Sequence, residues 1–281
     1  MRGASVRPIG LIAGNGRFPF LFAEAARARG IPVAAVAIRE ETDPALEGHV
    51  DRSAWFHVGQ LSAMIEFLQS AGCTEAVMAG QIHLSLLYHD FSVLMADPLA
   101  NDLLARLADH RGDSVLAAVA DVLEAHGIRL RPSTLFLEDH LAPAGSLTRR
   151  SPTAAEEADI AFGWGIAKAV AGLAFGQTVA VKDRTVVAVE AIEGTDACIR
   201  RAGEIGYGGV VVVKVAKPNQ DLRFDVPVVG TATMRALMDA KASVMAVEAG
   251  MTLVLDREAV VCLADEAGIA LVGVLAPGGT P

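Results

Sequence analysis

The sequence has few aromatic residues, few cysteines and no long apolar run. Phe, Trp and Tyr make up 5% of the 281 residues, and the three cysteines (Cys73, Cys198 and Cys262) are far apart. An odd number of distant cysteines fits neither a disulfide framework nor a thiolate metal site, which indicates a reducing cytoplasm. No stretch approaches the roughly 20 apolar residues of a membrane span, and the N-terminus lacks the apolar core of a signal peptide. We therefore expect a soluble, cytoplasmic protein, for which contact with a membrane surface stays open.

Positive charge is also scarce. The chain has 24 Lys and Arg against 33 Asp and Glu, which gives a net charge of −9. Nucleic-acid binding needs a broad basic face, so we expect no nucleic-acid partner. An anionic small molecule is still compatible with this balance where cations gather locally. The abundant residues are small and apolar: the chain is 52% hydrophobic and has 27 Gly. This composition is typical of an α/β protein whose strands are covered by Ala-rich helices.

The first half of the chain alternates short apolar runs with segments of helical periodicity. The apolar runs 9–13, 31–38 and 76–79 predict strands. Helices are predicted over residues 20–29, 60–71, 98–108 and 113–126. This alternation predicts a parallel sheet with helices on both faces, in which ligands bind beyond the carboxyl ends of the strands.

The pattern changes between about residue 130 and residue 152, where the stretch RPSTLFLEDHLAPAGSLTRRSP has no sustained period. We place the domain boundary there. Residues 1–133 are predicted to form an N-terminal Rossmann-like α/β domain on the nucleotide or sugar side, and residues 134–281 a C-terminal α/β catalytic domain. In the second half we expect strands at 178–181, 185–190, 209–215, 252–255 and 269–274, and helices at 153–173, from 195, at 231–248 and at 257–267. The active site is expected in the cleft between the two domains.

A glycine-rich turn follows the first predicted strand. Gly14, Asn15 and Gly16 stand between a strand and a helix, where glycines let a phosphate group approach backbone N–H groups. The third glycine of a dinucleotide fingerprint is missing, which weakens an interpretation as an NAD site. Gly80 and Gln81 end another predicted strand. Together the two turns suggest one rim of a site for a nucleotide or sugar, and tight turns without a ligand are the alternative.

Acidic side chains gather in the stretch EAIEGTDACIR. Glu190 and Glu193 follow a predicted strand, and Asp196 comes three residues later. Three neighbouring carboxylates repel one another unless a cation lies among them, and carboxylate oxygens are preferred ligands of Mg²⁺. Thr195 is a candidate helix N-cap, so a purely structural capping role for Thr195 and Asp196 is the alternative.

A second polar stretch, VKVAKPNQDLRFDVP, follows a strongly apolar run. Lys214, Lys217 and Arg223 can neutralise phosphate groups, and Asp221 and Asp225 can bind a metal or activate a water. Carboxylates for a metal combined with cations for phosphate are what phosphoryl transfer requires. A solvated loop is the alternative, but the prolines in this stretch favour a single loop conformation.

Several short motifs together resemble the LpxI family. They include IAGNGRFP, MAGQI, VEAIEGTDA and KPNQDLRFDVPVVG, and they span nearly the whole chain in order. The resemblance implies two α/β domains and a cytoplasmic, Mg²⁺-dependent pyrophosphatase of lipid A biosynthesis. Such an enzyme cleaves UDP-2,3-diacylglucosamine, a lipid-linked nucleotide sugar, to UMP and 2,3-diacylglucosamine 1-phosphate (lipid X). It also implies action at the cytoplasmic face of the inner membrane, with transient contact to the membrane surface, and the sequence is compatible with a homodimer.

The residues are assigned to this activity as follows. The predicted catalytic residues are Asp225, Asp221, Lys214 and Arg223, with Asp225 as metal ligand or water-activating base. The predicted Mg²⁺ ligands are Asp225, Glu193 and Asp196. The predicted substrate-binding residues are Gly14, Asn15, Gly16, Gly80, Gln81, Thr195, Lys217 and Gln220. Two alternatives stay open: a nucleotide-sugar-binding regulator without hydrolysis, and an NAD-type oxidoreductase.

Overall fold

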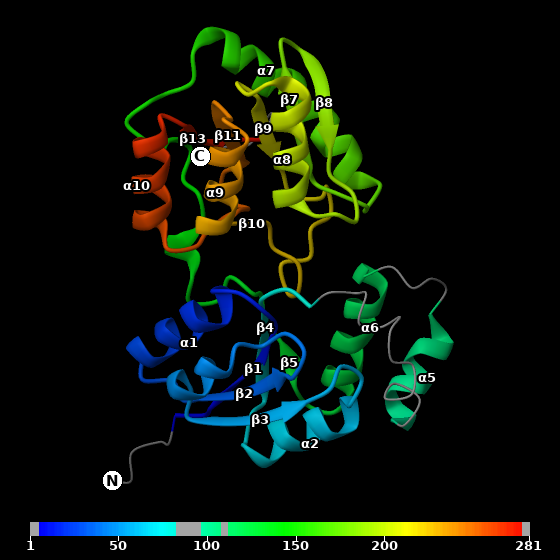
Figure 1. Ribbon diagram of the computed structural model, residues 1–281. Coiled ribbons are helices and arrows are strands. Elements are labelled where there is room, and N and C mark those ends of the chain that lie inside the picture. The colour runs from blue at the N-terminus through cyan, green and yellow to red at the C-terminus, as the bar shows by residue number, and fades with distance from the viewer. Residues whose placement is uncertain (1–5, 83–96, 108–111, 277–281) are drawn as a thin grey trace. The chain divides into compact units, whose positions relative to one another are not determined.

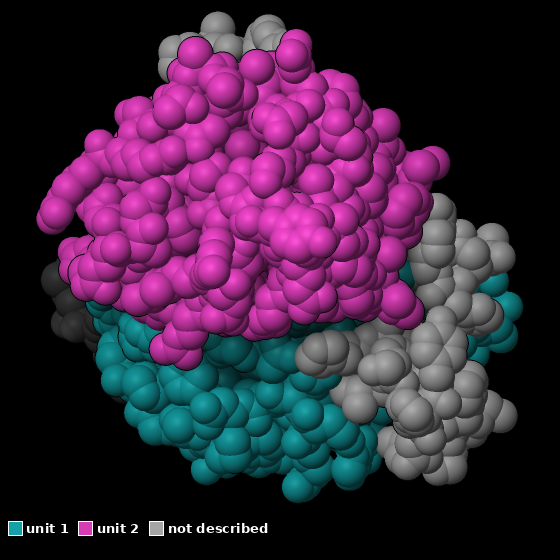
Figure 2. All heavy atoms as spheres, turned by 45° about the horizontal axis from the view of Figure 1, so that its top comes forward, with its two compact units in different colours: residues 1–138, 221–225 teal, residues 139–220, 226–281 magenta. Residues whose placement is uncertain are grey.

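The computed structural model describes residues 6–82, 97–107 and 112–276, which fold into two compact units (Figures 1 and 2). Unit 1 consists of Met1–Glu138 and the short segment Asp221–Asp225. Unit 2 consists of Asp139–Gln220 and Val226–Pro281. The division falls a few residues after the predicted boundary at residue 133. The segment Asp221–Asp225, expected in the C-terminal domain, packs with unit 1.

Unit 1 is built around a five-stranded parallel sheet with the strand order β3-β2-β1-β4-β5. Its strands are β1 (Ile9–Ala13), β2 (Val33–Ile38), β3 (Arg52–Phe56), β4 (Glu75–Ala79) and β5 (Arg129–Leu130). Every residue of β1 and β2 is buried, as expected for strands covered on both faces. The predicted parallel sheet is confirmed. The edge strand β3 begins with polar residues, and its sequence therefore lacks the apolar run that identified the others.

Helices cover both faces of this sheet (Figure 1). On one face lie α2 (Leu61–Ser70), α5 (Pro98–Arg106) and α6 (Gly112–Ala125). Apolar side chains from these helices and from alternate strand positions form the core on that side. On the other face, α1 (Phe18–Ala28) packs against β2, β4 and the 3-10 helix η1 (Pro44–His49).

Asp97 caps two helices of unit 1 at once. Its carboxylate accepts hydrogen bonds from the N–H groups of Leu99 (2.9 Å) and Ala100 (3.1 Å) at the start of α5. It also accepts bonds from the N–H (2.8 Å) and hydroxyl (2.9 Å) of Ser62 in the first turn of α2. Asp97 therefore satisfies several donors that the two helix N-termini would otherwise leave without partners.

Unit 2 contains a six-stranded mixed sheet with the order β6-β13-β11-β9-β7-β8. Three central strands run parallel, whereas the β7–β8 hairpin and β6 are antiparallel to their neighbours. The strands are β6 (Gly145–Ser146), β7 (Thr178–Lys182), β8 (Thr185–Val189), β9 (Val211–Lys214), β11 (Val244–Glu248) and β13 (Ala270–Val274). A separate two-stranded ladder joins β10 (Val228–Val229) to β12 (Leu253–Val254).

The two faces of the unit 2 sheet pack against different helices (Figure 1). The long helix α7 (Ala154–Gly172) covers one face, and Val211 and Val213 of β9 point toward it. The other face is covered by α8 (Thr195–Gly206), α9 (Thr231–Asp239) and α10 (Arg257–Ala267). Val212 points to that side, as the alternation of side chains along a strand requires.

The predicted helix at 231–248 is wrong in its second half. Helix α9 ends at Asp239, Lys241 has a positive φ of +48°, and the strand β11 begins at Val244. An apolar run such as SVMAV fits a buried strand as well as a helix, so periodicity alone did not separate the two. Its central place in the sheet favours the strand. Within the described ranges, every helix is too short or too polar to cross a membrane.

Candidate active site

The first candidate region lies at the carboxyl edge of the unit 1 sheet, between β1 and β4. β1 pairs with β2 on one side and with β4 on the other, so the chain order reverses here. Open α/β sheets bind their ligands at such a switch point, beyond the carboxyl ends of the strands. Gly14 follows β1 and Gly80 follows β4. Both predicted glycine turns therefore lie where the topology predicts a ligand.

The two turns touch one another through their backbones. Gly14 N–H donates to the carbonyl of Ala79 at 2.8 Å, and Asn15 N–H donates to that of Gln81 at 2.8 Å. A Cβ on Gly14 would lie 2.4 Å from the oxygen of Gln81. A Cβ on Gly80, whose φ is +90°, would lie 2.5 Å from the oxygen of Asn15. This close approach by itself requires glycine at both positions.

Gly16 and Asn15 form the more open part of the first turn. Gly16 has a φ of +83°, and no described atom lies within 4 Å of where its Cβ would be. The turn leads into the N-terminus of α1, whose N-cap residue Arg17 makes no side-chain capping bond. Asn15 Nδ2 donates to Glu41 Oε2 at 2.7 Å, which orients the amide. Unit 1 thus offers backbone and amide groups at this edge, the kind of groups that bind a nucleotide or sugar.

The segment Asp221–Asp225 is held in unit 1 by polar and apolar contacts. The N–H of Ser133 donates to the carbonyl of Leu222 at 2.6 Å, and its hydroxyl donates to the carbonyl of Arg223 at 2.9 Å. Phe224 packs against the core formed with α2, α5 and α6. Two predicted catalytic carboxylates therefore belong to the same unit as the glycine turns.

Asp221 and Arg223 bind one another within this segment. Nε of Arg223 lies 3.0 and 3.1 Å from the two carboxylate oxygens of Asp221, and Nη2 lies 2.7 Å from Oδ2. These hydrogen bonds hold the pKa of Asp221 below its usual range and raise that of Arg223. Part of the guanidinium predicted to grip a phosphate is therefore already used by a neighbouring carboxylate.

The second candidate region is a buried charged cluster at the carboxyl edge of the unit 2 sheet. Lys214 ends β9, Glu190 follows β8, and only 6% and 8% of these residues are exposed. Lys214 Nζ donates to the hydroxyl of Thr195 at 2.8 Å, and this hydroxyl donates to Glu190 Oε1 at 2.8 Å. Glu190 Oε2 accepts the N–H of Gln177 at 3.2 Å. We call Lys214, Thr195 and Glu190 the Lys214 cluster.

The Lys214 cluster is suited to an anion. An ammonium group has three N–H donors, and within the described part of the chain Nζ of Lys214 makes this one hydrogen bond. Thr195 is the first residue of α8, where backbone N–H groups lack partners inside the helix. The N-cap is Gly194, with a φ of +82°, and not Thr195 as the sequence suggested. The threonine hydroxyl is therefore used to connect Lys214 to Glu190.

The carboxylates predicted to bind Mg²⁺ are divided between the two units. Among the described residues, no group of three or more His, Cys, Asp and Glu side chains is arranged to hold a metal ion. Glu193 accepts a hydrogen bond of 2.6 Å from Arg201, which holds its pKa below the usual range. Asp225 belongs to unit 1, whereas Glu193 and Asp196 belong to unit 2.

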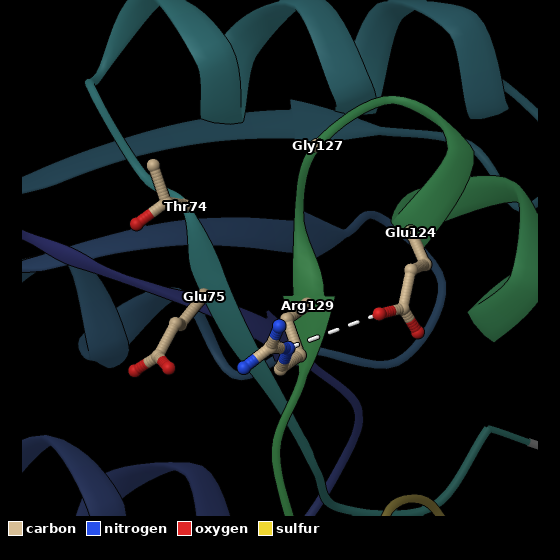
Figure 3. A pocket seen from close by; sticks show the side chains of 5 residues that line it. All are labelled: Thr74, Glu75, Glu124, Gly127 and Arg129. Atoms are coloured by element: carbon tan, nitrogen blue, oxygen red, sulfur yellow. Dashed lines mark ion pairs between the residues drawn. The ribbon is translucent and has the colours of Figure 1, made fainter.

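A surface cavity of unit 1 lies at the other edge of the sheet (Figure 3). It has a volume of about 340 Å³ and is lined by Thr74, Glu75, Glu124, Gly127 and Arg129. Glu75 begins β4 and Arg129 begins β5, so this is the amino edge. Nε of Arg129 faces Glu124 at 3.8 Å. Ligands of parallel sheets bind at the carboxyl edge, so we do not assign the substrate to this cavity.

The two buried cysteines do not supply a nucleophile to either region. Burial raises the pKa of the Cys73 thiol to about 11 and that of Cys198 to about 12, so both stay protonated near neutral pH. All three cysteines are free. The chemistry of the candidate regions therefore rests on carboxylates, lysines, hydroxyls and backbone groups.

Comparison with known proteins decides the family. Residues 8–140 match the LpxI N-terminal domain, and residues 143–272 match the LpxI C-terminal domain. A protein of Caulobacter vibrioides named UDP-2,3-diacylglucosamine pyrophosphatase LpxI is 33% identical, with 96% of this chain and 98% of the relative aligned. The chain belongs to the LpxI family. The resemblance carried by short motifs thus extends over both domains.

The two LpxI domains correspond to the two units, with one segment as an exception. The match to the LpxI C-terminal domain includes the segment Asp221–Asp225, which the structure places in unit 1. The structure brings Lys214 together with Thr195, and Asp221 with Arg223. Lys217 and Gln220 share a turn, in which Lys217 N–H donates to Gln220 Oε1 at 2.9 Å.

Two charged residues of this LpxI chain were missed by the sequence analysis. Lys168 and Glu248 form an ion pair on the α7 face of the unit 2 sheet. The available signals were weak: a single lysine in the Ala-rich stretch GIAKAVAG, and a glutamate that ends the apolar run VMAV. Nothing in either stretch shows that the two side chains meet.

Proposed function

We propose that this chain hydrolyses the pyrophosphate bond of UDP-2,3-diacylglucosamine in lipid A biosynthesis, releasing UMP and 2,3-diacylglucosamine 1-phosphate (lipid X). The observation that carries the proposal is the similarity, over nearly the full length of both chains, to a relative named for this activity. The Lys214 cluster supports it, because a buried ammonium and a helix N-terminus are suited to a phosphate group.

In this reaction a water oxygen forms a bond to one phosphorus, and the bond from that phosphorus to the bridging oxygen breaks. The bridging oxygen leaves with the electron pair on the other phosphate, so attack at either phosphorus gives the same two products. We assign Asp225 as the base that takes the proton of the attacking water. Lys214, with Thr195 beside it, would neutralise the charge that builds up on the phosphate oxygens.

The edge of unit 1 is proposed to bind the nucleotide or sugar. Gly14, Asn15 and Gly16 supply backbone N–H groups, and the exposed side chain of Gln81 supplies an amide that can read a base or sugar edge. Gly80 is needed for the close packing of the two turns. Lys217 and Gln220 are proposed as further substrate contacts, since their turn lies three residues after Lys214 in the chain.

The Mg²⁺ requirement remains a prediction from the family resemblance. The described residues contain no ready group of metal ligands, so we derive no step through an ion. Mg²⁺ is often bound by one or two carboxylates together with substrate phosphates, and a requirement could arise in that way. A cytoplasmic location, transient contact with the inner-membrane surface and a homodimer also remain predictions.

A product assay tests the proposal. Purified protein is incubated with UDP-2,3-diacylglucosamine in the presence of Mg²⁺ or of EDTA, and UMP and lipid X are quantified. We expect equal amounts of the two products with Mg²⁺ and none with EDTA. Intact substrate in both samples, from folded protein, would favour a nucleotide-sugar-binding regulator, and a nicotinamide signal would favour an oxidoreductase.

Asp225→Asn tests the assignment of the base. We expect the rate to fall on the order of a hundredfold to ten-thousandfold, the usual contribution of general base catalysis. Asp102→Asn is the matched control, because Asp102 is an exposed carboxylate of unit 1 paired with Arg106 on α5. A folded Asp225→Asn variant with the rate of the control would remove Asp225 from the mechanism.

A further inference from the structure

A second buried charged pair lies on the α7 face of the unit 2 sheet. Glu248, the last residue of β11, is 5% exposed, and Ala246 of the same strand belongs to the core against α7. Side chains alternate along a strand, so Glu248 points to that face as well. Lys168 of α7 places Nζ 2.8 and 2.6 Å from the two carboxylate oxygens of Glu248. The Lys214 cluster lies on the opposite face, which α8 covers.

The Lys168–Glu248 pair holds both backbone groups of a single residue. Glu248 Oε2 accepts the N–H of Ala216 at 2.7 Å, and Lys168 Nζ donates to the carbonyl of Ala216 at 2.9 Å. Ala216 is fully buried and lies just after β9, where the chain leaves the sheet. Charge-assisted hydrogen bonds are shorter and stronger than neutral ones. The direction of the chain beyond β9 is therefore set by two side chains that are distant in sequence.

The residues on either side of Ala216 are those proposed to contact the substrate. Lys214 precedes it by two residues, and Lys217 follows it directly. Lys217 N–H and the side chain of Gln220 then close a turn at 2.9 Å. Lys214 is held in β9 by its pairing with β11 and β7, so a change in the peptide planes at Ala216 would redirect Lys217.

Stability alone is a weak reason for such a pair. Replacing a buried ion pair by apolar residues of similar volume often leaves stability unchanged or raises it. The reason is that removing two charges from water offsets much of the attraction between them. An apolar pair could fill the same space against Trp164, whose ring lies 5.8 Å from Lys168 Nζ, but it could not bond to the backbone of Ala216.

We propose that Lys168 and Glu248 are positioning residues, which fix residues 216–220 so that Lys217 meets a phosphate of the substrate. The inference rests on the proposed pyrophosphatase function for its consequence in catalysis. Its structural part, the ordering of residues 216–220, stands on the contacts of unit 2 alone.

The test compares Lys168→Met, the double variant Lys168→Met/Glu248→Met, and Lys182→Met as a matched control. Lys182 also donates to two backbone carbonyls, those of Gly206 (2.7 Å) and Gly208 (3.0 Å). It ends β7, which runs antiparallel to β9. Lys182 therefore lies near the amino end of β9, whereas Lys214 lies at its carboxyl end. Each protein is measured for Tm, for hydrogen exchange of the Ala216 amide, and for kcat/KM with UDP-2,3-diacylglucosamine.

We expect Lys168→Met to lower Tm, because it leaves the Glu248 carboxylate buried without its counter-charge. The double variant should recover Tm, yet exchange faster at Ala216 and lose on the order of tenfold to a hundredfold in kcat/KM. Lys182→Met should keep the exchange rate at Ala216 and the kcat/KM of the unaltered protein.

A double variant that recovers kcat/KM together with Tm would overturn the inference, since the pair would then be merely structural. Normal protection of Ala216 in the double variant would overturn it as well. If the unaltered protein released no UMP, the proposed function would fail, and the exchange rate of Ala216 would still decide whether the pair orders residues 216–220.

Discussion

The two units present different chemistry at the carboxyl edges of their sheets. At the edge of unit 1, the turns after β1 and β4 pack backbone against backbone, and Gly14 and Gly80 make that approach sterically possible. At the edge of unit 2, buried charged side chains end or follow the strands: Lys214, Glu190 and Glu248 are all less than a tenth exposed. One edge offers shape and amide groups, and the other offers fixed charge.

The difference matches the two halves of a nucleotide-sugar substrate. A base or sugar is recognised by hydrogen bonds and close backbone approach, which need little charge. A pyrophosphate needs cations held in place before the reaction, because its transition state spreads negative charge over the phosphate oxygens. We therefore expect variants of the glycine turns of unit 1 to act mainly on binding and those of the Lys214 cluster to act mainly on kcat.

Among variants of the glycine turns and the Lys214 cluster, the largest effect is expected for Lys214→Met. Removing one preorganised donor from an active site typically costs on the order of a hundredfold to a thousandfold in kcat. Lys182→Met is again the control, since Lys182 ends a strand of the same sheet at its other edge. Steady-state release of UMP measures both. Equal kcat values for the two variants would place the phosphate away from the Lys214 cluster.

A smaller effect is expected for Gly14→Ala. Its new methyl group would lie 2.4 Å from the backbone oxygen of Gln81, so the two turns must separate. We expect a loss of about 1–3 kcal/mol in the free energy of unfolding, as for overpacking elsewhere, and a raised KM.

Gly16→Ala is the matched comparison for Gly14→Ala. Apart from its chain neighbours, no described atom lies within 4 Å of the new methyl group. The substitution therefore carries only the strain of a φ of +83°. That strain costs about 1–2 kcal/mol. Denaturant unfolding and KM measurements compare the two substitutions. An unchanged KM in both variants would show that the carboxyl edge of unit 1 takes no part in substrate binding.

Substitutions of Asp97 test the stability of unit 1 at a site away from its glycine turns. Burial alone would raise its pKa, but hydrogen bonds from Ser62, Ala100 and Leu99 outweigh burial and hold the pKa below the ordinary value. Its stabilising effect is therefore full above the ordinary pKa of aspartate and is lost as the pH falls through the lowered value. Asp97→Ala should cost about 1–2 kcal/mol near neutral pH, as for other N-caps, and less in acid.

Unfolding curves over a pH series measure the Asp97 effect, with Asp97→Asn as the variant that keeps a side-chain oxygen acceptor. A loss for Asp97→Ala that is the same at all pH values would show that the charge of the carboxylate plays no part. Neither variant should change kcat per folded molecule.

The smallest effect on the free energy of unfolding is expected for Arg223→Ala. The side chains of Arg223 and Asp221 are each 36% exposed, and ion pairs with this exposure contribute less than about 1 kcal/mol. Without the hydrogen bonds from Arg223, the pKa of Asp221 should rise toward its ordinary value. The contribution of the pair is present above that ordinary value and fades as the pH falls through the lowered pKa. NMR titration of the Asp221 carboxyl carbon measures the shift, and an unchanged pKa would contradict the pairing.

Much of the fold could be read from local sequence patterns. The apolar runs of β1 and β2 and the glycines that end β1 and β4 are local signals, and they were sufficient to predict the sheet and one edge of unit 1. The polarity after β9 likewise predicted a loop, which the structure has there, and its function stays a prediction. The division of residues 231–248 into a helix and a strand was not readable, because a short apolar run fits both.

The remaining features depend on contacts between distant residues. The bond from Ser133 to Arg223, which holds Asp221–Asp225 in unit 1, joins residues 90 positions apart. Lys168 and Glu248 are 80 positions apart. The sequence showed that carboxylates and cations were present, but it could not show which of them pair with one another. In the structure, Arg223 pairs with Asp221, and Lys214 bonds to Thr195.

The most direct test of the account is turnover in water labelled with oxygen-18, followed by mass spectrometry of both products. Hydrolysis by a water molecule predicts one labelled oxygen in the phosphate of either UMP or lipid X, because the water oxygen bonds to the phosphorus that it attacks. The site that carries the label also identifies that phosphorus. Unlabelled products, or intact substrate from folded protein, would contradict the proposed hydrolysis.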